Sequence, residues 1–182
     1  MKTYIGNIWN LMLPEEGYQI VIPVNLGWKT SGENVMGRGL AKEARCLFPG
    51  CDKWLGQYQK QIYELFKSAK VKPNDPKFAG QWTAWHDTAP LLFVPSKSLN
   101  EDAPWLSWKN KADPVLIDAG LKNLPEFARV NNIKKIAVPL LGAGNGGLEP
   151  AEMKSLIETR LGGDDRFALV LPKEFGTEGW VS

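Results

Sequence analysis

The stretch that decides the fold is Ile136-Ala-Val-Pro-Leu-Leu-Gly-Ala-Gly-Asn-Gly-Gly-Leu148. It begins as a continuous apolar run, which is typical of a strand buried on both faces. Four glycines then fall within six residues: Gly142, Gly144, Gly146 and Gly147. Because glycine has no Cβ, backbone N–H groups in such a turn can approach a ligand closely, and the helix predicted from Pro150 adds partial positive charge at its N-terminus. The stretch therefore predicts a phosphate- or diphosphate-binding turn between a strand and a helix.

Two other interpretations of these glycines were considered. A tight strand-to-helix loop without a ligand stays open from the sequence alone. The spacing Gly142-x-Gly144-x-x-Gly147 also matches the dinucleotide-binding fingerprint, but that fold needs the turn to open a series of strand–helix units. Only residues 149–182 follow here, enough for one helix and one strand. We therefore interpret the loop as closing a fold and set the dinucleotide-binding fold aside.

A second segment has the same order of features. Residues 19–25 form a nearly continuous apolar run, residues 26–35 a polar loop, and residues 37–48 a helix that begins at Gly37 and Gly39. Two glycine loops from distant parts of the chain can hold one anionic ligand from both sides. This pairing is the main functional hypothesis that comes from the residues themselves.

The whole chain alternates between strands and helices. Strands are predicted at residues 3–8, 19–25, 81–85, 90–95, 134–139 and 166–171, and helices at 37–48, 51–69, 113–130 and 150–160. Pro125 is expected to kink or split the third helix. The fold class is therefore α/β, a three-layer α/β/α sandwich with a mostly parallel, mixed central sheet. Asn25, Lys97 and Gly142 each follow a strand end, so we expect them on one rim of the sheet.

Composition limits the class of protein. The chain has 182 residues, 43% of them hydrophobic, and a net charge of +2, which predicts one globular domain over residues 1–182 and does not indicate a nucleic-acid scaffold. Cys46 and Cys51 are too few for a disulfide framework, and no cluster has metal-ligand spacing. The start is not a secretory signal, and no apolar run has membrane-spanning length. We expect a cytoplasmic protein with no membrane partner and no metal, in which His86 is structural.

Three ordered motifs resemble those of macrodomains, the ADP-ribose-binding α/β/α modules. They are Val24-Asn25 with Val35-Met-Gly-Arg-Gly-Leu-Ala41, then Phe93-Val-Pro-Ser-Lys97, then Pro139-Leu-Leu-Gly-Ala-Gly-Asn-Gly-Gly-Leu148. The second motif is similar to the branch of DarG-type antitoxin macrodomains and terminal ADP-ribose glycohydrolases, whose members carry a functional lysine there. The resemblance covers most of the chain.

Three departures from the family pattern stand out. Asn7 occupies the place of the usual aspartate that accepts from the adenine amino group, so its amide oxygen would accept without charge. Residues 27–34 make the first loop longer than usual. Gly146 stands where terminal glycohydrolases have an acidic residue, and this Asn-Gly-Gly form is closer to the DarG type, whose substrate is ADP-ribosylated DNA.

The resemblance assigns roles to particular residues. The ligand-binding set is Asn7, Ile8, Asn25, Met36, Gly37, Arg38, Gly39, Leu40, Pro95, Gly142, Ala143, Gly144, Asn145, Gly146, Gly147 and Leu148. Asn25 would bind the distal ribose hydroxyls, and the alternative is that its amide caps its own turn. Lys97 is the expected catalytic residue together with Asn25. A lysine at a buried strand end has a depressed pKa, so its neutral amine can attack or act as a base, whereas a charged one stabilises the leaving group. From the residues alone, a surface lysine ending a strand is the simpler interpretation.

The expected function is removal of ADP-ribose from a conjugate by cleavage at the distal ribose. The partner is ADP-ribose or an ADP-ribosylated macromolecule, with DNA preferred slightly over protein; no cofactor is needed and the chain is a monomer. The alternatives are an ADP-ribose-binding module without turnover, a phosphatase acting on ADP-ribose 1″-phosphate, and a protein that binds single-stranded nucleic acid through the loop around Trp105 and Trp108.

Overall fold

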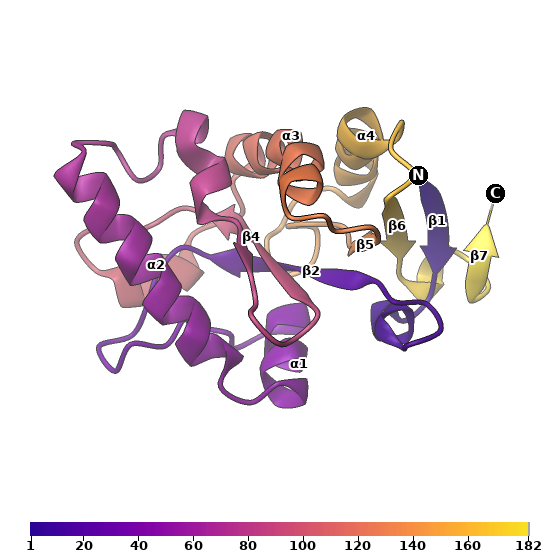
Figure 1. Ribbon diagram of the computed structural model, residues 1–182, viewed down its shortest axis with the longest axis horizontal. Helices are drawn as coiled ribbons and strands as arrows, with labels where there is room; N and C mark the ends of the chain where they lie inside the picture. The colour runs from indigo at the N-terminus through magenta and orange to yellow at the C-terminus, as the bar shows by residue number, and fades with distance from the viewer. Residues whose placement is uncertain (182) are drawn as a thin grey trace.

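A single mixed sheet organises residues 1–181, the part of the chain that a computed structural model describes (Figure 1). Its seven strands lie in the order β3-β4-β2-β5-β6-β1-β7. Their bounds are Lys2–Ile5 (β1), Gln19–Asn25 (β2), Ala84–Trp85 (β3), Leu91–Lys97 (β4), Ile136–Val138 (β5), Phe167–Leu171 (β6) and Gly179–Val181 (β7). The five inner strands, from β4 to β1, pair in parallel, whereas the edge strands β3 and β7 are antiparallel to their neighbours. The predicted mostly parallel, mixed sheet is confirmed.

Two pairs of helices cover the two faces of this sheet. They are α1 (Gly39–Leu47), α2 (Cys51–Ser68), α3 (Pro114–Val130) and α4 (Pro150–Leu161). Figure 1 shows α3 and α4 on the upper side of the sheet and α1 and α2 on the lower side. Each pair follows from the right-handed crossover that joins parallel strands. The result is the predicted three-layer α/β/α sandwich.

Each face of the sheet contributes alternate residues to its own core. Val21 of β2 and Leu92 of β4 pack with Ile117 of α3, whereas the next residues, Ile22 and Phe93, pack on the opposite side. Successive side chains of a strand point to opposite faces, so a strand with helices on both sides reads as an unbroken apolar run. This is why residues 19–25 and 91–94 look continuous in the sequence.

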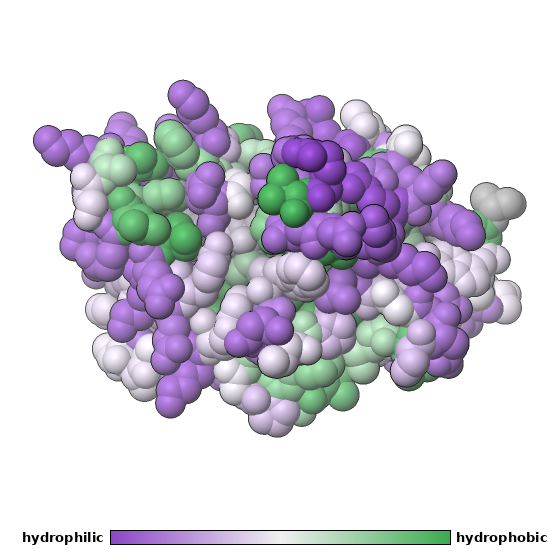
Figure 2. Space-filling model, in the orientation of Figure 1, coloured by the Kyte–Doolittle hydropathy of each residue, from purple (hydrophilic) through white to green (hydrophobic). Residues whose placement is uncertain are grey.

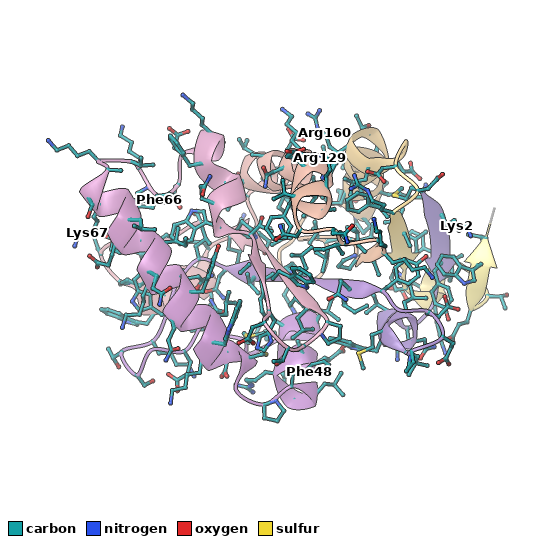
Figure 3. The ribbon with its side chains drawn as sticks, viewed as in Figure 1. Lys2, Phe48, Phe66, Lys67, Arg129 and Arg160 are labelled. Carbon is teal, nitrogen blue, oxygen red and sulfur yellow. The ribbon has the colours of Figure 1, made fainter. Side chains whose placement is uncertain are left out.

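A third core cluster anchors the far end of α2. Phe66 of α2 lies beside Trp82 with ring centroids 5.2 Å apart, and the Trp82 indole donates to Pro73 O at 2.9 Å. Leu26, just past β2, belongs to the same cluster as Phe66, which Figure 3 labels on α2. Trp82 lies in η2 (Pro76–Trp82), a 3-10 helix in a segment that the sequence predicted as loop to residue 80 and as strand afterwards.

Several predicted boundaries were wrong. The first strand was expected to reach Ile8, but β1 ends at Ile5, because Asn7 caps the 3-10 helix η1 (Ile8–Met12). β3 keeps only two of the five predicted residues, and residues 98–112 contain a further 3-10 helix, η3 (Pro104–Lys109). The strand predicted as last is followed by η4 (Lys173–Phe175) and by β7 at the sheet edge. Short helices and edge strands carry weak periodicity, so they are hard to recognise from sequence.

The prolines inside regular structure are explained by ladder geometry. Pro23 lies within β2, and its nitrogen faces the β5 side, where the pairing has already ended at Ile20. No ladder hydrogen bond is therefore lost there. Pro125 does not split α3, which runs unbroken from Pro114 to Val130, and Arg166 Nη2 donates to the Pro125 carbonyl at 3.1 Å. The alternative that Pro125 divides the helix is wrong.

The outer surface is mostly polar. Hydrophilic residues cover much of the face in Figure 2, with apolar colour at the lower edge, where α1 lies and where Leu47 is exposed. Within residues 1–181, no helix combines the length and the apolar character that a membrane crossing needs.

Candidate functional site

Three neighbouring strands end at the predicted rim. β4, β2 and β5 are adjacent in the sheet, and Lys97, Asn25 and Gly142 lie at or just beyond their carboxyl ends. The pairing of β2 with β4 shifts at this point: Val24 is opposite Pro95, but Asn25 is opposite Lys97. The extra residue, Ser96, is a bulge that re-aims the end of the strand. It brings Lys97 beside Asn25, which an unshifted ladder would not do.

A cavity of about 620 Å³ opens above this rim. Its walls include Gly37, Arg38, Gly39 and Leu40 of the first loop and Gly142, Asn145 and Gly146 of the second. The two loops meet, because a Cβ placed on Gly39 would lie 3.1 Å from the Asn145 amide nitrogen. The two distant glycine loops therefore line one cavity, and that they hold one anionic ligand stays a prediction.

The first loop presents a helix N-terminus to this cavity. α1 begins at Gly39, its N-cap is Arg38, and no side chain caps it. Gly39, Leu40 and Ala41 all line the cavity. The first N–H groups of a helix have no partner within the helix and carry partial positive charge, so they suit an anion. The exposed Arg38 adds a full positive charge beside them.

The second loop is shaped by glycine at two positions. Gly142 has a φ of +74°, and a Cβ there would lie 2.9 Å from Ala112 Cβ and from Leu148 Cδ1. Gly146 lies against the Gly142 carbonyl and Ala112, so it has no room for a side chain either. The loop needs these glycines for its own conformation, in addition to any ligand contact.

Lys97 is half-buried at the floor of the cavity. Its Nζ donates to the backbone carbonyl of Trp108 at 2.8 Å. Burial lowers the Lys97 pKa below its usual value of 10.5, because the charged amine loses water, and the nearby positive charge of Arg38 lowers it further. The direction predicted from the sequence is confirmed, and Lys97 lines the same cavity as Asn25.

Asn25 and the first loop rest on a buried polar network. Asn25 Nδ2 donates to Val35 O at 2.8 Å, which matches the alternative that this amide holds its own turn. Below it, Gln59 of α2 is fully buried; its Nε2 donates to Asn25 O at 2.9 Å and its Oε1 accepts from Gly27 N at 3.3 Å. Asn34 Nδ2 lies 3.0 Å from the same Oε1. The network fixes where the loop leaves β2, and Asn25 still lines the cavity.

A second cavity, of about 410 Å³, lies next to the first. Leu40 lines both, and Ala143 and Gly144 of the second loop line this one. Asn7 and Ile8 also line it, as does Phe175 of η4, which is 43% exposed. The two cavities therefore lie on either side of Leu40 and the second loop, and together they suit an elongated ligand held in the middle by the glycine turns.

Asn7 differs from its expected role in one respect. Its Oδ1, the predicted acceptor for an adenine amino group, already accepts from Trp9 N at 3.0 Å as the cap of η1. An amide oxygen has two lone pairs, so one remains, together with the two Nδ2 donors. Asn7 is exposed at the cavity mouth, which leaves these groups open to a ligand.

Four predicted ligand-binding residues do not line either cavity. Met36 is 1% exposed and its side chain lies in the core beneath α1. Pro95 is buried in β4 opposite Val24. Gly147 and Leu148 turn away toward α4, where Leu148 packs on the core beneath α3 and α4. Only some residues of each motif line a cavity, and the others do not, so a continuous motif predicts more ligand-binding residues than the cavities have.

The ligand-binding set predicted from the sequence lacks Trp108, Lys109 and Phe175, and Trp108 was named only for the alternative of single-strand binding. Trp108 and Lys109 line the first cavity from η3, and only tertiary packing brings that segment to the rim. Phe175 was within reach of the sequence, because it follows the carboxyl end of β6 by four residues and carboxyl ends carry the site.

His86 and the cysteines take no part in this site. His86 Nδ1 accepts from Thr88 N and Ala89 N, at 3.2 and 2.9 Å, and His86 lines neither cavity. Burial raises the pKa of the Cys51 thiol to about 11, which keeps it unreactive. No group of three or more His, Cys, Asp or Glu side chains in residues 1–181 is arranged to hold a metal ion.

Comparison with known proteins agrees with this geometry. The family model of the Macro domain matches residues 99–157. A curated relative, the DNA ADP-ribosyl transferase-DNA ADP-ribosyl glycohydrolase fusion protein of Thermosipho africanus (strain H17ap60334), is 29% identical over 126 residues, which cover 63% of this chain and 29% of the relative. The chain thus spans less than a third of that protein's length.

Two solved structures have the same fold. The Thermosipho africanus DarTG structure in complex with ADP-ribose has a TM-score of 0.59 at 22% identity, covering 89% of this chain and 40% of that one. The macrodomain of Mycobacterium tuberculosis DarG has a TM-score of 0.62 at 22% identity, covering 93% of this chain and 96% of that one. The chain therefore has the fold of DarG macrodomains over nearly its whole length, and residues 99–157 match the family model of the Macro domain.

Proposed function

We propose that this macrodomain binds ADP-ribose and removes it from a conjugate by hydrolysis at the distal ribose, with Lys97 as the catalytic residue. The observation that carries the proposal is the half-buried Lys97 amine, with its lowered pKa, on the floor of a cavity lined by two glycine loops. In this arrangement the glycine loops and the N-terminus of α1, which suit a phosphate, lie next to the amine of Lys97, which can act as a nucleophile.

The two cavities divide the ligand between them. The adenine ring lies in the second cavity, where Phe175 can stack on it and Asn7 can bond its edge. The diphosphate lies between the loops, at the N-terminus of α1. The distal ribose then lies in the first cavity, above Asn25 and Lys97. The similarity to a structure solved with ADP-ribose supports this choice of ligand.

The chemistry follows from the state of the Lys97 amine. A neutral amine donates one N–H to Trp108 O and keeps its lone pair for the anomeric carbon. Attack forms a bond from Nζ to C1″ and breaks the bond from C1″ to the conjugate, which leaves with one of the two Nζ protons. The other Nζ proton passes to the ring oxygen as the ring opens to an imine, and water then hydrolyses the imine to free ADP-ribose and the amine. Nucleic-acid-linked ADP-ribose is the preferred substrate, ahead of ADP-ribosylated acidic side chains, and the glycohydrolase named in the curated relative supports that preference.

The test compares the wild type with Lys97→Ala on DNA-linked and glutamate-linked ADP-ribose. We expect Lys97→Ala to bind free ADP-ribose by calorimetry and to lose at least about a hundredfold in turnover, as removal of a nucleophile or an acid–base group should. Lys60→Ala, an exposed lysine of α2 that lines neither cavity, is the matched control. Borohydride added during turnover should reduce the imine and leave ADP-ribose covalently on Lys97. Equal rates for Lys97→Ala and Lys60→Ala would exclude Lys97 from the chemistry.

Binding without turnover is the second candidate. The hydrogen bond from Lys97 Nζ to Trp108 O favours this candidate, because the bond gives Lys97 a structural role that needs no catalysis: it ties η3 to the sheet. In that case calorimetry would detect ADP-ribose, whereas neither conjugate would be cleaved. Release of inorganic phosphate from ADP-ribose 1″-phosphate, without cleavage of either conjugate, would point instead to a phosphatase.

A further inference from the structure

Two exposed tryptophans lie on the 3-10 helix η3: Trp105 is 46% exposed and Trp108 is 37% exposed, and Trp108 also lines the first cavity. Their sequence, Pro104-Trp-Leu-Ser-Trp-Lys109, places them one 3-10 turn apart. Trp85 is as exposed as Trp108 but lines neither cavity, so the position of Trp108, and not its exposure alone, points to a partner.

The exposure does not come from a loose segment. Ser107 is fully buried, and its Oγ accepts from Asn100 N at 2.9 Å. Asn110 Nδ2 donates to Ser98 O at 3.0 Å, and Gly27 of the first loop lies so close to the Pro104 carbonyl that a Cβ would have no room. These contacts hold the backbone of η3 against the segments that follow β2 and β4.

Trp108 adjoins the reacting atoms of the proposed function. Its carbonyl accepts from Lys97 Nζ at 2.8 Å, and the residue lines the first cavity. The conjugate is bonded to the anomeric carbon that Lys97 attacks, so it extends out of the cavity that Trp108 lines.

The chemistry of this exit suits a nucleic acid. An indole face stacks on any nucleobase, whereas it offers little to an acidic side chain. Lys109 Nζ lies 5.5 Å from the centre of the Trp108 ring, and Arg38 lines the same cavity, so cations are available for backbone phosphates. The acidic residues Glu101 and Asp102 precede the first residue of η3, whereas Lys109 is its last residue, so the negative and positive charges lie at opposite ends of η3.

We propose that Trp108 is a stacking platform for the nucleobase that carries ADP-ribose, and that with Lys109 it makes this site select nucleic-acid conjugates over protein conjugates. The inference rests on the proposed function and deepens it by naming the substrate class. Trp108 contacts the leaving part of the substrate and leaves the ADP-ribose contacts to the two loops. Free ADP-ribose therefore does not depend on the indole, and a nucleic-acid conjugate does.

The test uses Trp108→Leu, which removes the aromatic face, and Trp108→Phe, which keeps one. On a single-stranded oligonucleotide bearing ADP-ribose, Trp108→Leu should lower kcat/KM roughly tenfold to a hundredfold, mainly through KM, and Trp108→Phe should restore most of it. The ratio of kcat/KM on the oligonucleotide to kcat/KM on a glutamate-linked peptide should fall by the same factor in Trp108→Leu and recover in Trp108→Phe. Because Trp108 lines the first cavity and its carbonyl holds Lys97, this ratio cancels any loss that both conjugates share. Trp85→Leu is the matched control, because Trp85 is also 37% exposed and lines neither cavity.

A second variant keeps the test independent of any effect of Trp108 on folding. Lys109→Gln should reduce the slope of log affinity for the oligonucleotide conjugate against log salt by about one, and should reduce the slope for the peptide conjugate by less. Equal losses on both conjugates for Trp108→Leu, or no difference from Trp85→Leu, would overturn the proposal.

The outcomes for the wild type separate this inference from the proposed function. If the wild type binds ADP-ribose and cleaves only the glutamate conjugate, the proposed function stands and the platform is refuted. If the wild type binds no ADP-ribose and cleaves neither conjugate, the proposed function fails, and the platform fails with it.

Discussion

Gln59→Leu tests whether the buried network beneath the first loop holds that loop in place. Gln59 is fully buried on α2 and makes two kinds of contact: it donates to Asn25 O and accepts from Gly27 N and Asn34 Nδ2. Leucine fills a similar space and forms none of these bonds. In the variant, Asn34 Nδ2 still donates to Asn25 O at 2.9 Å, so neither of these groups is left without a partner. The Gly27 N–H, in contrast, loses its acceptor, Gln59 Oε1.

The magnitude follows from this count of bonds. One buried N–H left without a partner costs about 1–3 kcal/mol, and each further lost bond about 0.5–1.5 kcal/mol. The apolar leucine side chain offsets about 1–2 kcal/mol of that through burial. We expect a net loss of about 2 kcal/mol in the free energy of unfolding, which lowers Tm by roughly 4–8 °C for a chain of this size.

The assay is urea unfolding followed by far-UV circular dichroism, with Gln61→Leu as the control. Gln61 lies on the same helix but is exposed, so its replacement should stay within about 0.5 kcal/mol of the wild type. The m value should be unchanged, because the area exposed on unfolding is the same. ADP-ribose affinity should fall in Gln59→Leu alone, since the network positions the loop that lines the cavity. Equal stabilities for the two variants would refute the reasoning that this network supports the site.

Three further predictions concern the loops and two ionisable groups. Gly142→Ala should destabilise the protein by about 1–3 kcal/mol in thermal melts, because φ is +74° and Ala112 blocks the Cβ. At Gly37 a Cβ meets open space, so Gly37→Ala should leave Tm unchanged and should weaken only ADP-ribose binding, measured by calorimetry. The hydrogen bond from Arg160, and then its charge, lower the Asp118 pKa below 3.8, so the unfolded state binds more protons than the folded state. The stability from this pair is full above about pH 4 and is lost as the pH falls through the folded pKa. Asp118→Asn should therefore weaken the fall of Tm at acid pH, and an unchanged fall would contradict the prediction. Since the Lys97 pKa is lowered and its neutral form reacts, kcat/KM should rise with pH and level off below the usual 10.5; a rate that falls as pH rises would instead assign the charged amine to the leaving group.

The sequence anticipates the sheet better than its edges. Unbroken apolar runs such as residues 19–25 and 91–94 predict strands covered on both faces, because only a parallel sheet between two helix layers buries both sides. β7 and the 3-10 helices escape prediction, since three-residue strands and single turns carry no period long enough to read.

The candidate site divides in the same way. Both glycine loops and Lys97 are visible in the sequence, because a strand end followed by glycines or by a lone lysine is a local pattern. Met36, Pro95, Gly147 and Leu148 fall inside these motifs, but their side chains or positions belong to the core or to the far side of the loop. A motif marks a segment, and packing decides which of its atoms face the ligand.

The order of strands and helices, and the glycine turns that end two of them, were therefore determined by local chemistry: side-chain periodicity, missing Cβ atoms and helix starts. Only the tertiary structure decided that Lys97 lies beside Asn25, through the bulge at Ser96, and that Trp108 lines the same cavity. The physical reason is range. A strand or a turn depends on residues next to one another, whereas a register shift and the docking of η3 depend on contacts between segments that the sequence keeps apart.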